Sequence, residues 1–224
     1  MKYYNFELES EPKIIGVRNG IYQVELDRKA YDKETYKQIE LSFIRNKFTA
    51  EQIIPDVNFN FYFKKLKSAK KTSFMSFTPY LKHGHFLVQK NTLGLFKNFN
   101  VQKYKAYESV IYDSPNENLD NNYQLFYCVL KDWEVIDFEN TVFTSGGFGN
   151  NPKIEHKFSN ENDMRNFNGI TSVKTLALTK SFDNTLDFFH TRLGGLFVSE
   201  RLKTALEESS ATGMVFREKI EVII

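Results

Sequence analysis

Apolar and polar positions alternate most regularly from Val57 to Phe63, where every second side chain is valine or phenylalanine. A period of two places these side chains on one face of an extended chain, so the segment predicts a strand. The run from Tyr123 to Leu130 is apolar at almost every position and predicts a central strand that is covered on both faces. Shorter apolar runs predict further strands at Tyr3 to Leu8, Ile21 to Leu26, Phe86 to Val88, Val135 to Phe138 and Thr171 to Leu178.

The chain from Leu196 to Phe216 predicts a strand, a capped helix, a turn and a last strand. Ser199 stands at the expected N-cap, where its hydroxyl can accept a hydrogen bond from an amide of the first turn. Apolar side chains then recur at steps of three and four residues, which gives one narrow buried stripe. A glycine suits the turn that follows the helix. The residues expected to hold this element in place are Ser199, Leu202, Leu206 and Gly213.

A second helix is predicted from Thr92 to Phe99, again between two strands, so the order strand, helix, strand occurs twice. The repetition fits either a degenerate duplication or a common motif used twice. The segment from Tyr31 to Lys47 fits a helix or a strand equally well. We therefore predict an α+β fold with mostly antiparallel sheets and a few packed helices, including two similar strand-helix-strand units.

The glycine- and asparagine-rich segment from Thr144 to Pro152 predicts a loop. We expect one compact domain over residues 1–224, or two closely packed halves at 1–143 and 153–224 that this loop joins. Hydrophobic residues make up 41% of the 224 residues, enough for a substantial core.

The net charge of +2 gives no general attraction to nucleic acid or to a membrane. The single cysteine, Cys128, cannot form an internal disulfide, and no apolar run approaches the roughly 20 residues of a membrane span. The segment from Met1 to Glu7 does not resemble a secretory signal. A soluble cytoplasmic protein without membrane contact is the expectation.

Two histidines and a glycine-rich run invite a chemical interpretation. His83 and His85 are two ligands where a zinc site needs three or four, so we expect a turn and no metal. The run from Gly146 to Gly149 lacks the lysine and serine of a phosphate-binding loop, and a surface loop is expected there. Its Phe148 is a candidate anchor for a protein partner.

Charged residues suggest two other activities. The run from Lys64 to Lys71 contains five lysines and would suit a nucleic-acid-binding module, although it lacks interleaved arginines and aromatics. Carboxylate pairs such as Asp137 with Glu139, or Asp183 with Asp187, would suit a small hydrolase. Both remain alternative functions.

Five segments resemble a family of bacterial immunity proteins from polymorphic toxin systems, over roughly residues 57–224. The strongest are GLFVSERLKTALEE at Gly195 to Glu208 and TGMVF at Thr212 to Phe216. The others are KKLKSAKKTSFMS from Lys64, HFLVQKNTLGLFKNFNV from His85 and YQLFYCVLKDWEVIDFENTVF from Tyr123.

The resemblance implies a non-catalytic protein, without a cofactor, that binds a cognate toxin and occludes it. It transfers no catalytic residues, and nucleic acid is not an expected partner. If the toxin has a basic active site, an acidic loop would attract it and speed association. The predicted contacts are the acids of this loop, Asp113, Glu117 and Asp120, together with the candidate anchor Phe148.

Overall fold

The computed structural model describes residues 1–18, 22–45, 53–78, 85–113, 118–147 and 152–224. The helices are α1 (Pro12–Ile15), α2 (Lys33–Ile39), α3 (Lys90–Leu95), α4 (Glu161–Asn166) and α5 (Glu200–Glu208), and a π-helical segment (Glu40–Arg45) continues α2. The strands are β1 (Tyr3–Leu8), β2 (Val24–Leu26), β3 (Phe61–Lys65), β4 (Phe74–Met75), β5 (Phe77–Thr78), β6 (His85–Gln89), β7 (Tyr104–Tyr112), β8 (Asp120–Cys128), β9 (Val142–Ser145), β10 (Ile154–His156), β11 (Ser172–Ala177), β12 (Phe188–Thr191), β13 (Gly195–Ser199), β14 (Met214–Arg217) and β15 (Glu221–Ile223).

The largest sheet closes on itself as a barrel. Its strand order is β4-β6-β8-β7-β3-β2-β5, so β4 and β5 stand at opposite ends although only Ser76 separates them in sequence. The two ends meet at Ser76, whose carbonyl accepts hydrogen bonds from the backbone N–H groups of Gln23 and Val24 at 3.0 and 3.3 Å. Side chains fill the interior of a barrel this narrow. Here they come from the strands and from α2 with its π-helical segment: Ile39, Phe43, Phe61, Phe63, Met75, Leu87, Tyr107 and Leu125.

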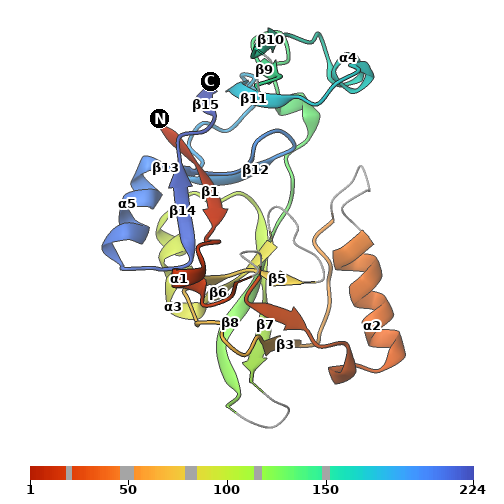
Figure 1. Cartoon of the computed structure of the whole chain (residues 1–224), viewed down its shortest axis with the longest axis vertical. Coiled ribbons are helices and arrows are strands. Elements are labelled where there is room, and N and C mark those ends of the chain that lie inside the picture. The colour runs from red at the N-terminus through yellow and green to blue at the C-terminus, as the bar shows by residue number, and fades with distance from the viewer. Residues whose placement is uncertain (19–21, 46–52, 79–84, 114–117, 148–151) are drawn as a thin grey trace.

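A second sheet, ordered β12-β13-β1-β14, lies between two hydrophobic cores. Successive side chains of a strand point to opposite faces, so adjacent side chains of β1 pack into different cores. Tyr4 and Phe6 pack toward the outside of the barrel, whereas Tyr3 packs toward the third sheet. That third sheet is ordered β10-β9-β11-β15 and lies near both chain ends (Figure 1).

Two units of the fold share one topology. In the first unit, β6 leads into α3 and then β7, and β8 pairs between β6 and β7. In the second unit, β13 leads into α5 and then β14, and β1 pairs between β13 and β14. All four of these pairings are antiparallel. The units differ in the origin of the middle strand, because β8 follows its unit in sequence whereas β1 begins the chain.

The two units hold each other through matching backbone contacts. The N–H of Asn100, after α3, donates to the Asp187 carboxylate at 2.9 Å, just before β12. The N–H of Thr212, after α5, donates to the Ser73 hydroxyl at 3.2 Å, just before β4. Each unit therefore fixes the loop that follows the other unit's helix. Between them, the Phe6 ring lies 5.2 Å from Phe74, 5.4 Å from Phe86 and 5.5 Å from Phe188.

The segment from Leu196 to Phe216 adopts the predicted strand, helix, turn and strand, but the strand from Met214 is not the last one, because β15 follows it. The Ser199 hydroxyl accepts from the Leu202 N–H at 3.2 Å and donates to Asp187 Oδ1 at 2.6 Å. Leu202 and Leu206 are fully buried. Gly213 has a φ of +86°, a conformation that glycine adopts without strain.

The predicted α+β class with mostly antiparallel sheets is confirmed; only the pairs β2–β5, β3–β7 and β11–β15 are parallel among the strands described. Several boundaries differ from prediction. The strand predicted from Val57 begins only at Phe61, because Val57 and Phe59 pack against the barrel core without joining a ladder. The ambiguous segment from Tyr31 is helical through α2 to Arg45.

The strand predicted from Val135 to Phe138 is wrong. A 3₁₀ turn, η5 (Trp133–Val135), occupies its start, and the rest makes a single bridge between Ile136 and Leu178. The Asp137 side chain then accepts from the Asn140 N–H at 3.2 Å, which turns the chain away. The loops predicted from Asp113 and from Thr144 are also shorter than expected, because β8 starts at Asp120 and β9 extends to Ser145.

Replacing Gly213 with alanine should destabilise the fold strongly. A Cβ there would lie 2.0 Å from the Phe74 carbonyl oxygen and 2.6 Å from the Thr72 hydroxyl. Gly195 is the matched control, because its φ of +84° is similar but nothing lies within 4 Å of an added Cβ. We expect Gly195→Ala to cost about 1–2 kcal/mol of unfolding free energy through backbone strain alone. Gly213→Ala should lower the unfolding free energy by at least about 2 kcal/mol more than Gly195→Ala does, measured by urea denaturation. Equal losses in the two variants would show that the close approach of Phe74 and Thr72 to Gly213 does not matter.

The buried carboxylate of Asp187 should make stability depend on pH. Burial opposes its ionisation, but hydrogen bonds from Arg201, Ser199 and the Asn100 N–H outweigh burial and lower the pKa of this carboxyl group. A lowered pKa contributes stability above the unfolded value of about 3.9, and this contribution is lost as pH falls through the folded value. At pH 7, Asp187→Asn should cost about 2–3 kcal/mol.

The difference in unfolding free energy between wild type and Asp187→Asn should therefore shrink below about pH 4. Denaturant titrations from pH 7 to pH 3 measure it. A constant difference over that range would show that the ionised form of Asp187 contributes nothing.

Candidate interaction surfaces

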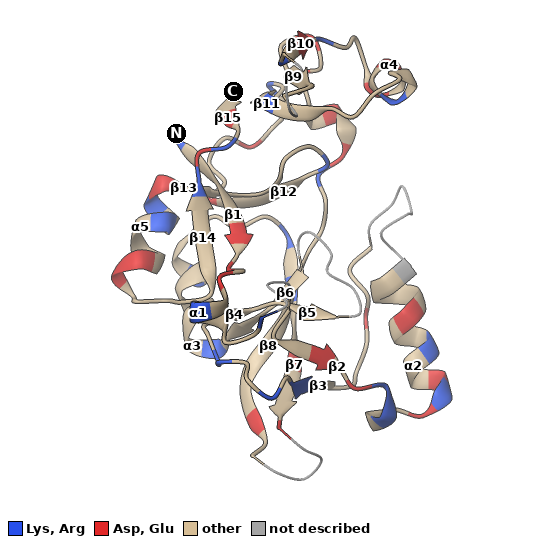
Figure 2. Ribbon diagram, viewed as in Figure 1, with Lys and Arg blue, Asp and Glu red and all other residues tan. Residues whose placement is uncertain are grey.

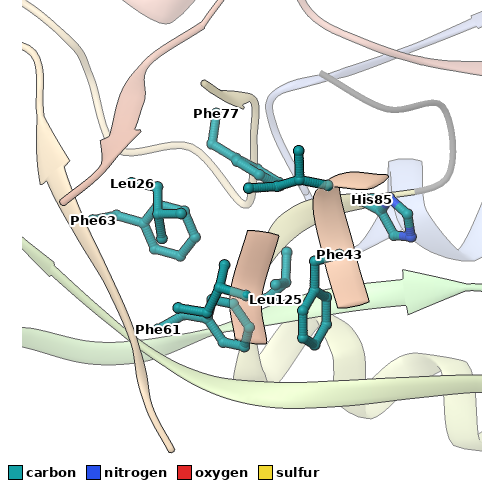
Figure 3. A pocket seen from close by; sticks show the side chains of 9 residues that line it. Leu26, Phe43, Phe61, Phe63, Phe77, His85 and Leu125 are labelled. Carbon is teal, nitrogen blue, oxygen red and sulfur yellow. The ribbon is translucent and has the colours of Figure 1, made fainter. Parts of the chain in front are cut away.

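One small cavity lies inside the barrel, between the sheet and α2. Phe43 and His85 line one end of it and Leu26 and Phe63 the other (Figure 3). Its volume is about 20 Å³, room for roughly one water molecule, and its exposed lining is entirely apolar. A cavity of this size and lining does not accommodate a substrate.

Three of the four carboxylates proposed for a hydrolase, Asp137, Asp183 and Asp187, have structural partners. Asp187 is fully buried and its carboxylate binds Ser199, the Asn100 N–H and Arg201. Asp183 accepts from the Thr185 hydroxyl at 2.6 Å. Among the residues that the structure describes, no group of three His, Cys, Asp or Glu side chains is placed to hold a metal ion. His83 lies outside the described residues, and the His85 ring lies 4.2 Å from the Tyr127 ring.

The two described acids of the predicted acidic loop each pair with a lysine. Lys65 Nζ lies 2.9 Å from Asp113, and Lys71 Nζ lies 2.7 Å from Asp120. Lys65 lowers the pKa of the Asp113 carboxyl group. Burial opposes ionisation of Asp120, but Lys71 and the Asn122 N–H outweigh it and lower that pKa too. Two lysines from β3 and the segment after it thus bring positive charge to the acidic ends of β7 and β8.

Leu119, next to these pairs, is 59% exposed. We call Lys65, Lys71, Asp113, Leu119 and Asp120 the hairpin patch. The other two predicted contacts, Glu117 and Phe148, lie outside the described residues.

Some lysines of the run from Lys64 to Lys71 make structural contacts within the protein. Besides its pair with Asp113, Lys65 Nζ donates to the carbonyl oxygens of Leu66 and Ala69 at 3.3 and 3.1 Å. Lys70 Nζ donates to the carbonyl oxygen of Lys13 in α1 at 2.8 Å. Lys64 and Lys67 remain exposed. Figure 2 shows basic and acidic residues together on α2 and on α5, so these two helices carry both signs of charge.

A third group of residues was not found from the sequence as a site. Trp133 in η5 lies under two guanidinium groups. The central guanidinium carbon of Arg165 in α4 lies 5.8 Å from the indole centroid, and that of Arg192, after β12, lies 5.5 Å away. We call these three residues the arginine–tryptophan patch. They are far apart in sequence, so no local pattern brings them together.

In the part of the chain that the structure describes, no helix has the length and apolar character needed to cross a membrane.

Comparison with models of known protein families gives a match. The sequence matches the immunity protein family (Imm11) over residues 3–221, from the first residue of β1 to the first residue of β15. No curated protein matches it. Because the match spans nearly the whole chain and both strand-helix-strand units, this chain belongs to the immunity protein family Imm11.

Proposed function

We propose that this protein binds one cognate toxin and neutralises it by covering a surface that the toxin needs, without catalysis and without a cofactor. The observation that carries the proposal is membership of an immunity protein family over residues 3–221. Neutralisation by binding requires a rigid surface that is complementary to the toxin, and it requires no reacting group on this chain.

The hairpin patch supports the proposal as a toxin contact. Its two lysine–aspartate pairs tie the ends of β7 and β8 to the end of β3 and to the segment after it, which lowers the conformational entropy that these groups lose on binding. Leu119 adds a largely exposed apolar side chain between charged groups, the arrangement of an anchor with a polar rim.

The paired lysines change how such a contact would work. An unpaired acidic loop would attract a basic toxin at long range, whereas two ion pairs carry no net charge and act only at contact. Asp113 and Asp120 are therefore proposed as short-range contacts. Glu117 and Phe148 stay as proposed contacts on the strength of the sequence alone.

Co-expression tests the proposed function. The genes next to this one should include one whose product is toxic alone and harmless when this protein is present. An inactivated variant of that product should be captured by the tagged protein at a one-to-one ratio, measured by light scattering of the purified complex. If no neighbouring product binds and none is toxic, the proposal fails.

Replacing Leu119 with aspartate should weaken toxin binding with little effect on folding. Its exposed side chain gives up little packing in the free protein, while an anchor buried in a complex contributes at least about 1.4 kcal/mol, or tenfold in Kd. Leu41→Asp is the matched control, because Leu41 is 50% exposed on the π-helical segment. Titration calorimetry measures both variants; equal affinities for Leu119→Asp and wild type would remove the hairpin patch from the interface.

A further inference from the structure

Strand β14 lies at the end of the second sheet. In the part of the chain that the structure describes, it pairs only with β1 (Figure 1). The N–H of Glu9 donates to the carbonyl oxygen of Gly213, the residue before β14, at 3.0 Å. Hydrogen-bonded pairs recur at every second residue of an antiparallel ladder, so Val215 and Arg217 direct their N–H and C=O groups toward β1.

The other two residues of β14 face the open edge of the sheet. Met214 and Phe216 direct their N–H and C=O groups away from β1, because they alternate with the residues that bond to it. Their side chains are half-buried against the core outside the barrel. Such an edge is a template for a further strand, since its backbone donors and acceptors match those of an extended chain.

The corresponding strand of the first unit has a companion. β7 begins opposite the last residue of β8, just as β14 begins opposite the last residue of β1. The chain that leads into β3 lies beside the start of β7, where Lys105 Nζ is 2.9 Å from Asp56 and the Tyr107 hydroxyl donates to the carbonyl oxygen of Pro55 at 2.6 Å. β3 itself then pairs with the second half of β7. Among the described residues, no strand continues the second sheet beyond β14.

The charges at this edge indicate which segment it suits. Arg217 and Lys219 share the carboxylate of Glu7, at 3.1 and 2.7 Å, so two positive charges meet one negative charge. Glu218 pairs with Lys2 at 2.8 Å and leaves this excess unchanged. A segment with an acidic side chain would balance the excess positive charge. A second copy of β14 would bring the same excess, which disfavours pairing of the protein with itself.

We propose that the open edge of β14 binds an extended segment of the toxin as a fifth strand of the four-stranded second sheet. The proposal rests on the proposed function, which supplies the toxin as the partner. The segment bonds to the outward N–H and C=O groups of Met214 and Phe216, carries apolar side chains beside these two residues and places an acid beside Arg217. Main-chain hydrogen bonds supply the affinity of such pairing, and alternate side chains supply its specificity.

Amide hydrogen exchange, followed by NMR, tests the edge without the toxin. In the free protein, the N–H groups of Val215 and Arg217 should be at least about tenfold better protected than those of Met214 and Phe216, because only the first two bond to β1. Equal protection at all four positions would overturn the proposal, because the edge would then already be covered.

A short peptide tests whether the edge accepts a strand. The probe is a blocked pentapeptide of alternating valine and glutamate, and it should raise the protection of the Met214 and Phe216 amides in a saturable way. The matched control is the same peptide with every residue N-methylated, which keeps the side chains and the charge but removes the backbone donors. No response to the first peptide, or an equal response to both, would contradict strand pairing.

Affinity for the captured toxin tests the partner. Met214→Pro removes an outward N–H and no bond to β1, whereas Met214→Ala loses the same side chain and keeps that N–H. Met214→Pro should therefore raise the Kd at least about tenfold above that of Met214→Ala. The wild-type complex gives a second measurement that needs no variant, because the amides of Met214 and Phe216 should become protected in it. Unchanged protection there would remove this edge from the interface.

These experiments separate the inference from the proposed function. If the wild type captures a toxin that binds Met214→Pro and Met214→Ala equally well, the inference fails while the proposed function holds. If no toxin is found, the proposed function fails, and the peptide still decides whether the edge accepts an extended chain. A dimer in light scattering that Met214→Pro dissociates would assign the edge to a second copy and overturn the proposal.

Discussion

The buried carboxylate of Asp187 is one point at which hydrogen bonds join the strand-helix-strand units; another is the contact between Thr212 and Ser73. The Asp187 carboxylate accepts hydrogen bonds from the Asn100 N–H of the first unit and from the Ser199 hydroxyl of the second, and Arg201 neutralises its charge. A fully buried carboxylate is tolerated only when its oxygens are satisfied, so these groups must arrive together. The start of α5, the loop after α3 and the start of β12 are thereby fixed as one assembly.

This joining makes the fold depend on contacts between distant parts of the chain. β1 completes the second unit between β13 and β14, so the first residues of the sequence pair with nearly the last. The barrel likewise closes only when the segment around Ser76 reaches β2 and β6 at once. Both closures bring together residues that are far apart in sequence, which is costly in chain entropy and slows folding.

The difference between contacts among neighbouring residues and contacts between distant parts of the chain also explains what could be predicted from the sequence. The cap at Ser199, the buried stripe of Leu202 and Leu206 and the turn at Gly213 depend on neighbours within a few residues, and local periodicity indicates them. The barrel closure at Ser76 could not be predicted in this way, because no local pattern indicates that one bent segment pairs at both ends of a sheet. The pairing of Asp113 and Asp120 with lysines, and the assembly around Trp133, are tertiary in the same way.

Charge is distributed in a way that favours recognition by discrete contacts over long-range attraction. Acids and bases occur together on α2, α4, α5 and β7, the net charge is +2, and the described acids of the hairpin patch are each paired. Dissolved ions screen the remaining electrostatic field of the protein within about 10 Å. The choice of partner must therefore come from shape and from individual desolvated groups. The hairpin patch lies where the ends of β7 and β8 meet the end of β3 and the segment after it, whereas the arginine–tryptophan patch lies on η5, α4 and the turn after β12, next to the second unit. Because the two units are joined at Asp187, surfaces that they carry keep a fixed separation, and this rigidity would itself select against partners of the wrong shape.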